Sequence, residues 1–286
     1  MPIIIVEEEV AMIWSLHDSA RRAVVFGAVC CKLLATAWGS QSPEWAVLNI
    51  AHRGGIVPGY AENTLATYGR AISFDVDVIE IDLRGTRDGE VIILHDETLD
   101  RTTDGTGKVT DFTLEELKQL NAGGGESIPT YAEVLDLVAN TGVKLLLDIK
   151  VSPMLDKEKV VRLTESHDAV LDVIVGVRTL GDLREFRRLN PNIRTLGFVR
   201  SPEDIDDFVA GGIDIIRLWP EWIEADQEIV GKVQGLGKPV WTTAGDASRE
   251  ALEELIRSGV NGILSDFPDV ASRVMADLEA RQRGAQ

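Results

Sequence analysis

The chain has little cysteine, and its basic residues are too few to balance its acidic ones. Its two cysteines among 286 residues are the neighbours Cys30 and Cys31, so the sequence indicates neither a disulfide scaffold nor a CxxC zinc site. With 29 basic against 47 acidic residues the formal net charge is −18, which makes nucleic acid and anionic membranes unfavourable partners. The same acidic excess fits a protein that binds a cation. Hydrophobic residues make up 44% of the chain, an ordinary globular proportion that excludes a disordered chain.

Residues 1–46 differ in composition from the rest and are predicted to form an N-terminal extension. Arg21 and Arg22 precede an apolar run that ends near Ala37. This order resembles a secretory signal, and a helix packed on the domain is the alternative. The run is shorter than the roughly 20 residues that a bilayer requires, so no stable membrane span is expected. A signal within residues 1–37 would mean an exported or periplasmic protein; otherwise the cytoplasm is indicated.

Residues 47–286 are predicted to form an α/β domain. Short apolar runs rich in β-formers alternate there with amphipathic helical patterns, which is typical of a parallel sheet with crossover helices. About eight such units in roughly 240 residues predict a (β/α)8 TIM barrel. The predicted strands are 47–51, 78–83, 91–94, 144–149, 173–177, 194–198, 213–218, 239–242 and 262–264.

The number of strands does not fit an ideal barrel, because nine candidates compete for eight places. The link between 78–83 and 91–94 is too short for a crossover helix, since a parallel connection needs about a dozen residues. We therefore expect a barrel distorted near this link or one strand outside it. An open doubly wound sheet is the alternative, although the sequence has no GxGxxG motif after a first strand.

Polar side chains gather where the predicted strands end, which is the side that carries the chemistry of a TIM barrel. Strand alternation places Glu80 and Asp82 on one face of the second strand, and Asp148 ends the fourth. Buried carboxylates are costly unless they are paired or bind a metal. Ligands made only of oxygen favour Ca²⁺ or Mg²⁺ over zinc. The sequence therefore predicts one such divalent cation bound by these three residues.

Two histidines and two basic residues complete the candidate site. The chain has only four histidines, and His52 and His95 follow the first and third predicted strands, where they can act as an acid/base pair near neutral pH. Arg53 and Lys150 add positive charge that suits the oxygens of a phosphate group. Together these residue types indicate metal-assisted phosphoryl-ester chemistry on a small-molecule substrate.

Further motifs occur in a fixed order along the chain. They include His52-Arg53-Gly54, Glu62-Asn63-Thr64, Ile79-Glu80-Ile81-Asp82, Thr86-Arg87-Asp88-Gly89, the run from Leu99 to Gly107, Leu147-Asp148-Ile149-Lys150, Val240-Trp241-Thr242 and the run from Gly262 to Pro268. Over residues 47–270 this set resembles the glycerophosphodiester phosphodiesterase family of TIM-barrel enzymes, which is related to phosphoinositide-specific phospholipase C.

The resemblance implies a metal-dependent enzyme that releases glycerol 3-phosphate and an alcohol from glycerophosphodiesters. It implies His52 and His95 as the catalytic pair. Glu80, Asp82 and Asp148 match the positions of metal ligands. Arg53 and Lys150 match phosphate-binding positions, and Trp241 is a further candidate to contact the substrate.

Several alternatives stay open at this point. Asp148 stands where many members of the family have Glu, and an Asp there also resembles the spider-toxin phospholipase D enzymes. Phospholipase D-like action on lysolipids or sphingomyelin is therefore one alternative, and a non-catalytic barrel that binds a phosphorylated ligand is another. Trp241 could stack on the substrate or fill the barrel mouth, and Glu62 could support the metal site or lie at a helix end. The head group, the nucleophile and the oligomeric state are undecided.

Overall fold

Runs of β-branched and leucine residues form the strands, because these side chains suit a pleated surface that is buried on both faces. The computed structural model describes residues 47–284, so the expectations for residues 1–46 lie outside the described part. Its strands are β1 (Leu48–Ala51), β2 (Val78–Gly85), β3 (Val91–Ile93), β4 (Lys144–Ile149), β5 (Val173–Val177), β6 (Arg194–Gly197), β7 (Ile215–Leu218), β8 (Val240–Gly245) and β9 (Gly262–Ser265).

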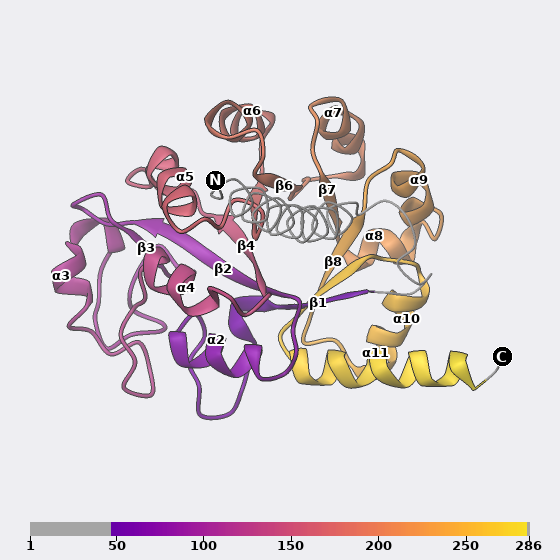
Figure 1. Cartoon of the computed structure of the whole chain (residues 1–286), viewed down its shortest axis with the longest axis horizontal. Helices are drawn as coiled ribbons and strands as arrows, with labels where there is room; N and C mark the ends of the chain where they lie inside the picture. Colours follow the sequence, from indigo (N-terminus) through magenta and orange to yellow (C-terminus); the bar gives the residue numbers. More distant parts are fainter. Residues whose placement is uncertain (1–46, 285–286) are drawn as a thin grey trace, which may run out of the picture. The chain divides into compact units, whose positions relative to one another are not determined.

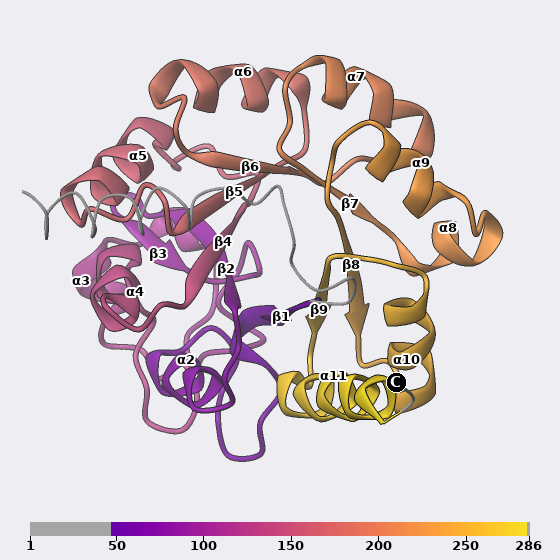
Figure 2. The same cartoon turned by 45° about the vertical axis from the view of Figure 1, so that its right-hand side comes forward.

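Eight of these strands are parallel and close into a barrel. They pair in the order β1-β9-β8-β7-β6-β5-β4-β2, and β2 pairs again with β1. Parallel neighbours need long crossover connections, and helices supply them around the outside of the strands (Figures 1 and 2). The predicted (β/α)8 TIM barrel is therefore confirmed.

The ninth strand, β3, lies outside the barrel, which was one of the two expectations for the short link. It pairs antiparallel with β2 after a tight turn in which Gly89 has a φ of 77°. The backbone nitrogen of Leu94 donates to the carbonyl of Asp82 at 3.0 Å. His95 thus reaches the barrel mouth on a segment that returns alongside β2.

The helices are amphipathic segments between the strands, and hydroxyl side chains cap several of their amino ends. Thr64, for example, accepts a hydrogen bond from the backbone nitrogen of Thr67 at 3.3 Å, as expected of an N-cap. The α-helices are α2 (Leu65–Ile72), α3 (Leu114–Leu117), α4 (Tyr131–Val138), α5 (Lys157–Ser166), α6 (Leu180–Leu189), α7 (Ile205–Ala210), α8 (Pro220–Ala225), α9 (Ile229–Gly235), α10 (Arg249–Arg257) and α11 (Pro268–Arg283), and the 3₁₀ turns are η1 (His52–Gly54), η2 (Val109–Asp111) and η3 (Pro202–Asp204).

The core has two main layers, because successive side chains of a strand point to opposite faces. The larger layer packs one face of the sheet against helix residues such as Tyr68 and Phe186. The smaller layer fills the barrel interior, and every barrel strand contributes to it. Its buried members are Ile50, Val78, Leu146, Ile174, Leu196, Phe198, Ile215, Trp241 and Leu264. None of the helices within residues 47–284 is long and apolar enough to cross a bilayer.

Candidate active site

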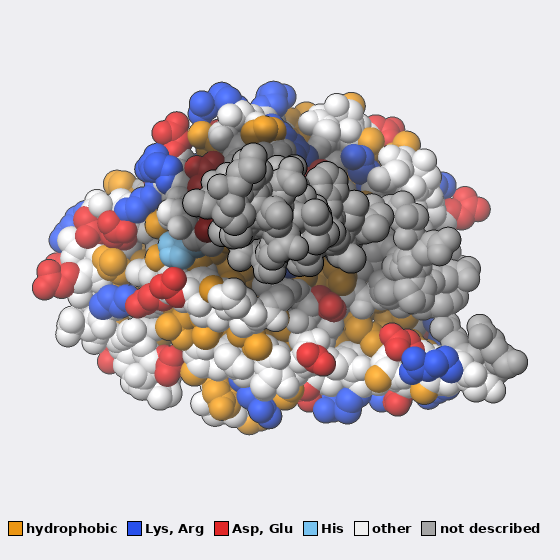
Figure 3. All heavy atoms as spheres, in the orientation of Figure 1, with side chains coloured by type: hydrophobic (Ala, Val, Ile, Leu, Met, Phe, Trp, Pro, Cys, Tyr) orange, Lys and Arg blue, Asp and Glu red, His pale blue; other side chains and the backbone are white. Residues whose placement is uncertain are grey.

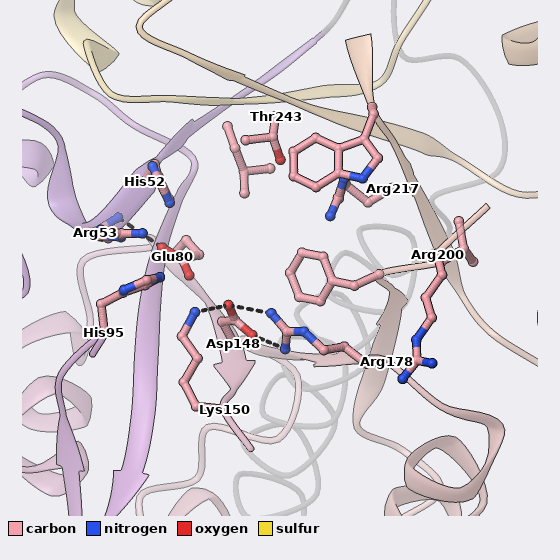
Figure 4. Close-up of a pocket in the computed structure, with 14 residues that line it drawn as sticks. His52, Arg53, Glu80, His95, Asp148, Lys150, Arg178, Arg200, Arg217 and Thr243 are labelled. Carbon is pink, nitrogen blue, oxygen red and sulfur yellow. Dashed lines mark hydrogen bonds and ion pairs between the residues drawn. The ribbon is translucent and has the colours of Figure 1, made fainter. Parts of the chain in front are cut away.

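A pocket of about 650 Å³ opens at the carboxyl ends of the barrel strands (Figure 4). All eight barrel strands and the segment after β3 contribute to its wall. The lining residues are His52, Arg53, Glu80, His95, Asp148, Lys150, Arg178, Phe198, Val199, Arg200, Arg217, Trp219, Thr243 and Leu264. This is the end of a TIM barrel at which enzymes carry their chemistry, and the candidate residues His52, Arg53, Glu80, His95, Asp148 and Lys150 all line this pocket.

The backbone after β1 is strained in a way that aims two side chains at the pocket. Arg53 has a φ of 54°, a left-handed conformation that costs energy for a residue other than glycine. Gly54 follows with a φ of 84°, and a Cβ there would lie only 2.7 Å from Cγ2 of Thr67. Glycine is therefore required at this point of the His52-Arg53-Gly54 motif, and the turn holds His52 and Arg53 in the pocket wall.

The His52 imidazole is held by a carboxylate from the far end of the chain. Its Nδ1 lies 2.5 Å from Oδ1 of Asp266, which directly follows β9, the neighbour of β1. Burial by itself lowers the pKa of His52, but the bond to Asp266 and the nearby Glu80 carboxylate outweigh burial and raise it above the ordinary value. Asp266 lies in the motif that runs from Gly262 to Pro268, but the sequence pattern gives it no role of its own.

His95 is held in a similar way, by its neighbour in the sequence. Its Nδ1 lies 2.7 Å from Oδ1 of Asp96, and Nε of Arg101 donates to the other oxygen of Asp96 at 2.6 Å. Arg101 also donates to Glu62 at 2.8 Å, and Glu62 accepts from Nη1 of Arg53 at 3.1 Å. Burial lowers the pKa of His95, and the bond to Asp96 only partly opposes this effect. Glu62 thus links two arginines.

The three predicted metal ligands lie close together. Glu80, Asp82 and Asp148 are buried, and one oxygen of each lies within 4.8 Å of the others. Parallel pairing places Asp82 opposite Asp148, and Glu80 shares the face of Asp82. Burial and the charge of Asp82 raise the pKa of Glu80 to about 8. Oxygen-only donors packed so closely that burial and repulsion raise the pKa of one of them fit a hard divalent cation, which would relieve this repulsion.

Two basic residues lie against these carboxylates. The Lys150 Nζ is 2.8 Å from Oδ1 of Asp82 and 2.5 Å from Oδ2 of Asp148. The backbone nitrogen of Arg53 donates to Oε2 of Glu80 at 2.9 Å. Both residues also line the pocket. They are therefore placed to offset charge on the carboxylates and to meet an anionic ligand.

A buried amide orients one of the carboxylates, and sequence analysis missed its role. Nδ2 of Asn63 donates to Oδ2 of Asp82 at 2.7 Å, and Oδ1 of Asn63 accepts from the Tyr68 hydroxyl at 2.7 Å. Asn63 has a φ of 58°. The signal was present in the Glu62-Asn63-Thr64 motif, but only the fold brings this amide to β2.

Asp148 has an unexpected partner in Arg178, which follows β5. Nη1 of Arg178 donates to Oδ1 of Asp148, and Nη2 donates to Oδ2 at 2.9 Å. Burial alone would raise the pKa of Asp148, but Arg178 and Lys150 lower it to about 2. No motif in the sequence pointed to Arg178. Its position directly after a barrel strand was the only available signal.

Trp241 is not in the pocket wall. Its side chain is fully buried, at 0% exposure, among the residues that fill the barrel interior. Of the two roles expected for Trp241, this position corresponds to filling the barrel. A side chain without exposed surface cannot stack on a substrate in this structure. The indole in the pocket wall belongs to Trp219, which is 39% exposed and follows β7.

Comparison with known proteins gives a consistent result. Residues 52–196 match the glycerophosphoryl diester phosphodiesterase family. The chain is 33% identical over 235 residues to a glycerophosphodiester phosphodiesterase from Caldanaerobacter subterraneus, covering 78% of this chain and 95% of that protein. Among solved structures, a glycerophosphoryl diester phosphodiesterase from Parabacteroides distasonis is similar with a TM-score of 0.73 and 28% identity, over 83% of this chain and 89% of that one.

A phosphodiesterase from Oleispira antarctica, solved in complex with the product sn-glycerol 3-phosphate, is also similar. Its TM-score is 0.70 and its identity is 25%, over 79% of this chain and 96% of that one. The closed barrel, the ordered motifs and these matches agree with one another. The chain therefore belongs to the glycerophosphoryl diester phosphodiesterase family.

Proposed function

We propose that the protein hydrolyses glycerophosphodiesters to glycerol 3-phosphate and an alcohol, with one bound Ca²⁺ or Mg²⁺. The observation that carries the proposal is the placement of two carboxylate-held imidazoles, those of His52 and His95, in one pocket with a buried cluster of three carboxylates. Family membership and the product bound to the similar Oleispira antarctica enzyme support the same reaction.

The cation would be held by Glu80, Asp82 and Asp148, whose oxygens already lie close together. When bound there, a divalent cation supplies polarisation of a phosphate oxygen and compensation of developing negative charge. Arg53 and Lys150 bind and orient the phosphate from the same wall of the pocket, because a guanidinium and an ammonium both donate to its oxygens.

The histidines supply the proton transfers. One imidazole takes a proton from the nucleophile as its oxygen bonds to phosphorus, and the other gives a proton to the alcohol oxygen as the bond between that oxygen and phosphorus breaks. The carboxylates of Asp266 and Asp96 occupy the Nδ1 atoms, which leaves Nε2 of each ring for these transfers. The nucleophile is water or the glycerol hydroxyl of the substrate, and a cyclic phosphate found in single-turnover experiments would identify the hydroxyl.

The test is release of glycerol 3-phosphate from glycerophosphocholine, glycerophosphoethanolamine and glycerophosphoglycerol. Each substrate is supplied with EDTA and then with Ca²⁺ or Mg²⁺ restored. Release that stops with EDTA and returns with one cation is expected. Absence of release with every cation would contradict the proposal. Turnover of lysophosphatidylcholine would then favour the phospholipase D-like alternative, and binding without turnover would favour the non-catalytic barrel.

A further inference from the structure

The pocket is positively charged although the protein as a whole is strongly acidic. The chain carries a net charge of −18, and acidic and basic side chains are interspersed on the described part of the face in Figure 3. The pocket wall, in contrast, contains five arginine and lysine residues against two carboxylates. The cations are Arg53, Lys150, Arg178, Arg200 and Arg217, and the carboxylates are Glu80 and Asp148.

These cations lie on two sides of the pocket. Figure 4 shows Arg53 with the two histidines on one side, and Arg178, Arg200 and Arg217 on the other. The reacting phosphate belongs to the first side, where the candidate acid/base pair lies. The reacting phosphate therefore does not account for the three arginines on the second side.

Arg217 is the most informative member of the second group. It lies in β7, is 6% exposed and lines the pocket. Within residues 47–284, its buried Nε and Nη1 atoms have no hydrogen-bond partner, and no ion pair includes its guanidinium. Burial and the nearby charge of Arg178 lower the pKa of Arg217 to about 10, so the side chain still carries its charge at neutral pH. An unpaired buried cation is costly, and an anionic ligand would remove that cost.

The neighbouring carboxylate is already engaged. Asp148 accepts from both Nη atoms of Arg178 and from Lys150, and within residues 47–284 it forms no ion pair with Arg217. Glu221 is an exposed residue in the first turn of α8, and it affects the pKa of Arg217 only through its charge. Within residues 47–284, the Arg217 guanidinium is therefore available to a ligand.

Aromatic rings hold this guanidinium in place. Its carbon lies 3.5 Å from the ring centroid of Trp219 and 5.2 Å from that of Phe198, and Arg178 lies 4.8 Å from the same Phe198 ring. Stacked arginines keep their N–H donors free for in-plane hydrogen bonds. The arrangement presents a rigid donor fork to the pocket, and such preorganisation favours binding of an oxyanion.

We infer that Arg217, with Arg200, binds a second oxyanion of the substrate, which is a phosphate monoester or a carboxylate on the alcohol part of the diester. The inference rests on the proposed function and specifies its substrate class. Hydrolysis still breaks only the bond between the diester phosphorus and the alcohol oxygen, and the second oxyanion leaves unchanged on the alcohol. A cationic head group such as choline is disfavoured by the same charges.

The experiment compares kcat/KM for four diesters that differ at one end. They are glycerophosphoglycerol, the same compound with a terminal phosphate monoester, and the analogue with a terminal carboxylate; glycerophosphocholine is the cationic comparison. At least one anionic diester should exceed glycerophosphoglycerol by tenfold or more, and the two anionic compounds identify which oxyanion the site prefers. Equal values, or a preference for choline, would overturn the inference.

Substitution of Arg217 tests the assignment to this residue. Arg217→Met should lower the preference for the anionic diester at least tenfold, whereas Arg217→Lys should retain part of it. Arg188→Met is the matched control, because Arg188 is an exposed arginine on α6 with its nearest carboxylate, Glu158, at 3.6 Å. An equal loss on all diesters in Arg217→Met would overturn the inference.

Two further measurements cover the remaining outcomes. If Arg217→Met does not fold, added salt should still lower kcat/KM of the wild type more steeply for the anionic diester than for glycerophosphoglycerol; parallel salt curves would contradict the inference. If no diester is hydrolysed with any cation, the proposed function fails. Calorimetry of the phosphorylated diester with wild type and with Arg217→Lys then tests the oxyanion site alone. If both proteins bind this diester with equal affinity, and bind it no more tightly than glycerophosphoglycerol, the inference is overturned.

Discussion

The Nδ1 atom of His52 lies 2.5 Å from Oδ1 of Asp266, although 214 positions separate the two residues. Asp266→Asn removes the charge and keeps the shape. Because the carboxylate sets the tautomer and orientation of the ring, we expect kcat to fall by about 100-fold or more with a smaller change in KM. Steady-state kinetics of the purified variant measures both.

Asp269→Asn serves as the control for that substitution. Asp269 lies in the first turn of α11 and pairs with Arg273 at 2.8 Å on the surface. The activity of the Asp269→Asn variant should therefore match that of the wild type. A kcat for Asp266→Asn within about threefold of the wild type would show that the His52 ring does not depend on this carboxylate.

His52→Ala and His95→Ala should each abolish turnover without unfolding the protein. Each ring is the proposed donor or acceptor of a proton in the reaction, and loss of such a group typically costs about 100- to 10,000-fold in rate. Release of glycerol 3-phosphate and circular dichroism check activity and folding. His167→Ala is the control, because His167 directly follows α5 outside the pocket and its Nδ1 contacts the carbonyl of Leu163 at 2.7 Å. Near-normal activity of either pocket variant would rule out that histidine.

Glu80→Gln should weaken binding of Ca²⁺ or Mg²⁺ by about tenfold or more. The buried carboxylate is one of three oxygen donors within 4.8 Å of one another, and a neutral amide is a weaker ligand for a hard cation. Calorimetric titration of the metal alone measures the effect without turnover. Glu97→Gln provides the comparison, since Glu97 is exposed and pairs with Lys108 at 3.2 Å. Unchanged affinity in Glu80→Gln would exclude this carboxylate as a ligand.

Arg101→Met should lower stability in a pH-dependent way. The hydrogen bonds from Arg101 hold the pKa of Asp96 well below its usual range, and Arg101 and Arg53 together outweigh burial and lower the pKa of Glu62. Carboxyls with a lowered folded-state pKa stabilise the fold above their unfolded value of about 4, and this contribution is lost as the pH falls below it.

The difference in free energy of unfolding between wild type and Arg101→Met is therefore expected to be about 1 kcal/mol at pH 7, after screening by solvent, and to shrink below pH 4. Urea unfolding at several pH values measures it. Arg257→Met, at a surface arginine whose carboxylate partner Glu253 is 3.6 Å away, should show a smaller difference. A difference for Arg101→Met that grows towards low pH would contradict the argument.

Truncation of the two tryptophans should affect different properties, the stability of the fold for Trp241 and the KM for Trp219. Trp241→Ala opens a cavity in the barrel interior and should cost about 3–5 kcal/mol of stability. Trp219→Ala removes a partly exposed pocket residue, so it should change KM with a loss of stability of about 1 kcal/mol or less. Unfolding curves and kinetics of the two variants compare these effects. Equal destabilisation would contradict the assignment of Trp241 to the core.

The sequence alone predicted the barrel, because alternating strands and helices are visible as local patterns, and it also named candidate site residues that the fold brings to one end of the barrel. Alternation of apolar runs with amphipathic segments indicates strands and crossover helices, and the predicted range 144–149 agrees with β4. The face shared by Glu80 and Asp82 follows from the period of a strand. Placement of these polar residues at one mouth follows from the parallel direction of the strands.

Tertiary structure decided the features that join distant positions. Asp266 reaches His52 because closure of the barrel pairs β9 with β1, and Asn63 reaches Asp82 from the loop before α2. The interior position of Trp241 depends on which side chains closure of the barrel brings together. The same holds for Nε and Nη1 of Arg217, which have no hydrogen-bond partner within residues 47–284. A pattern along one strand shows which residues share a face, but only the closed fold determines what each face meets.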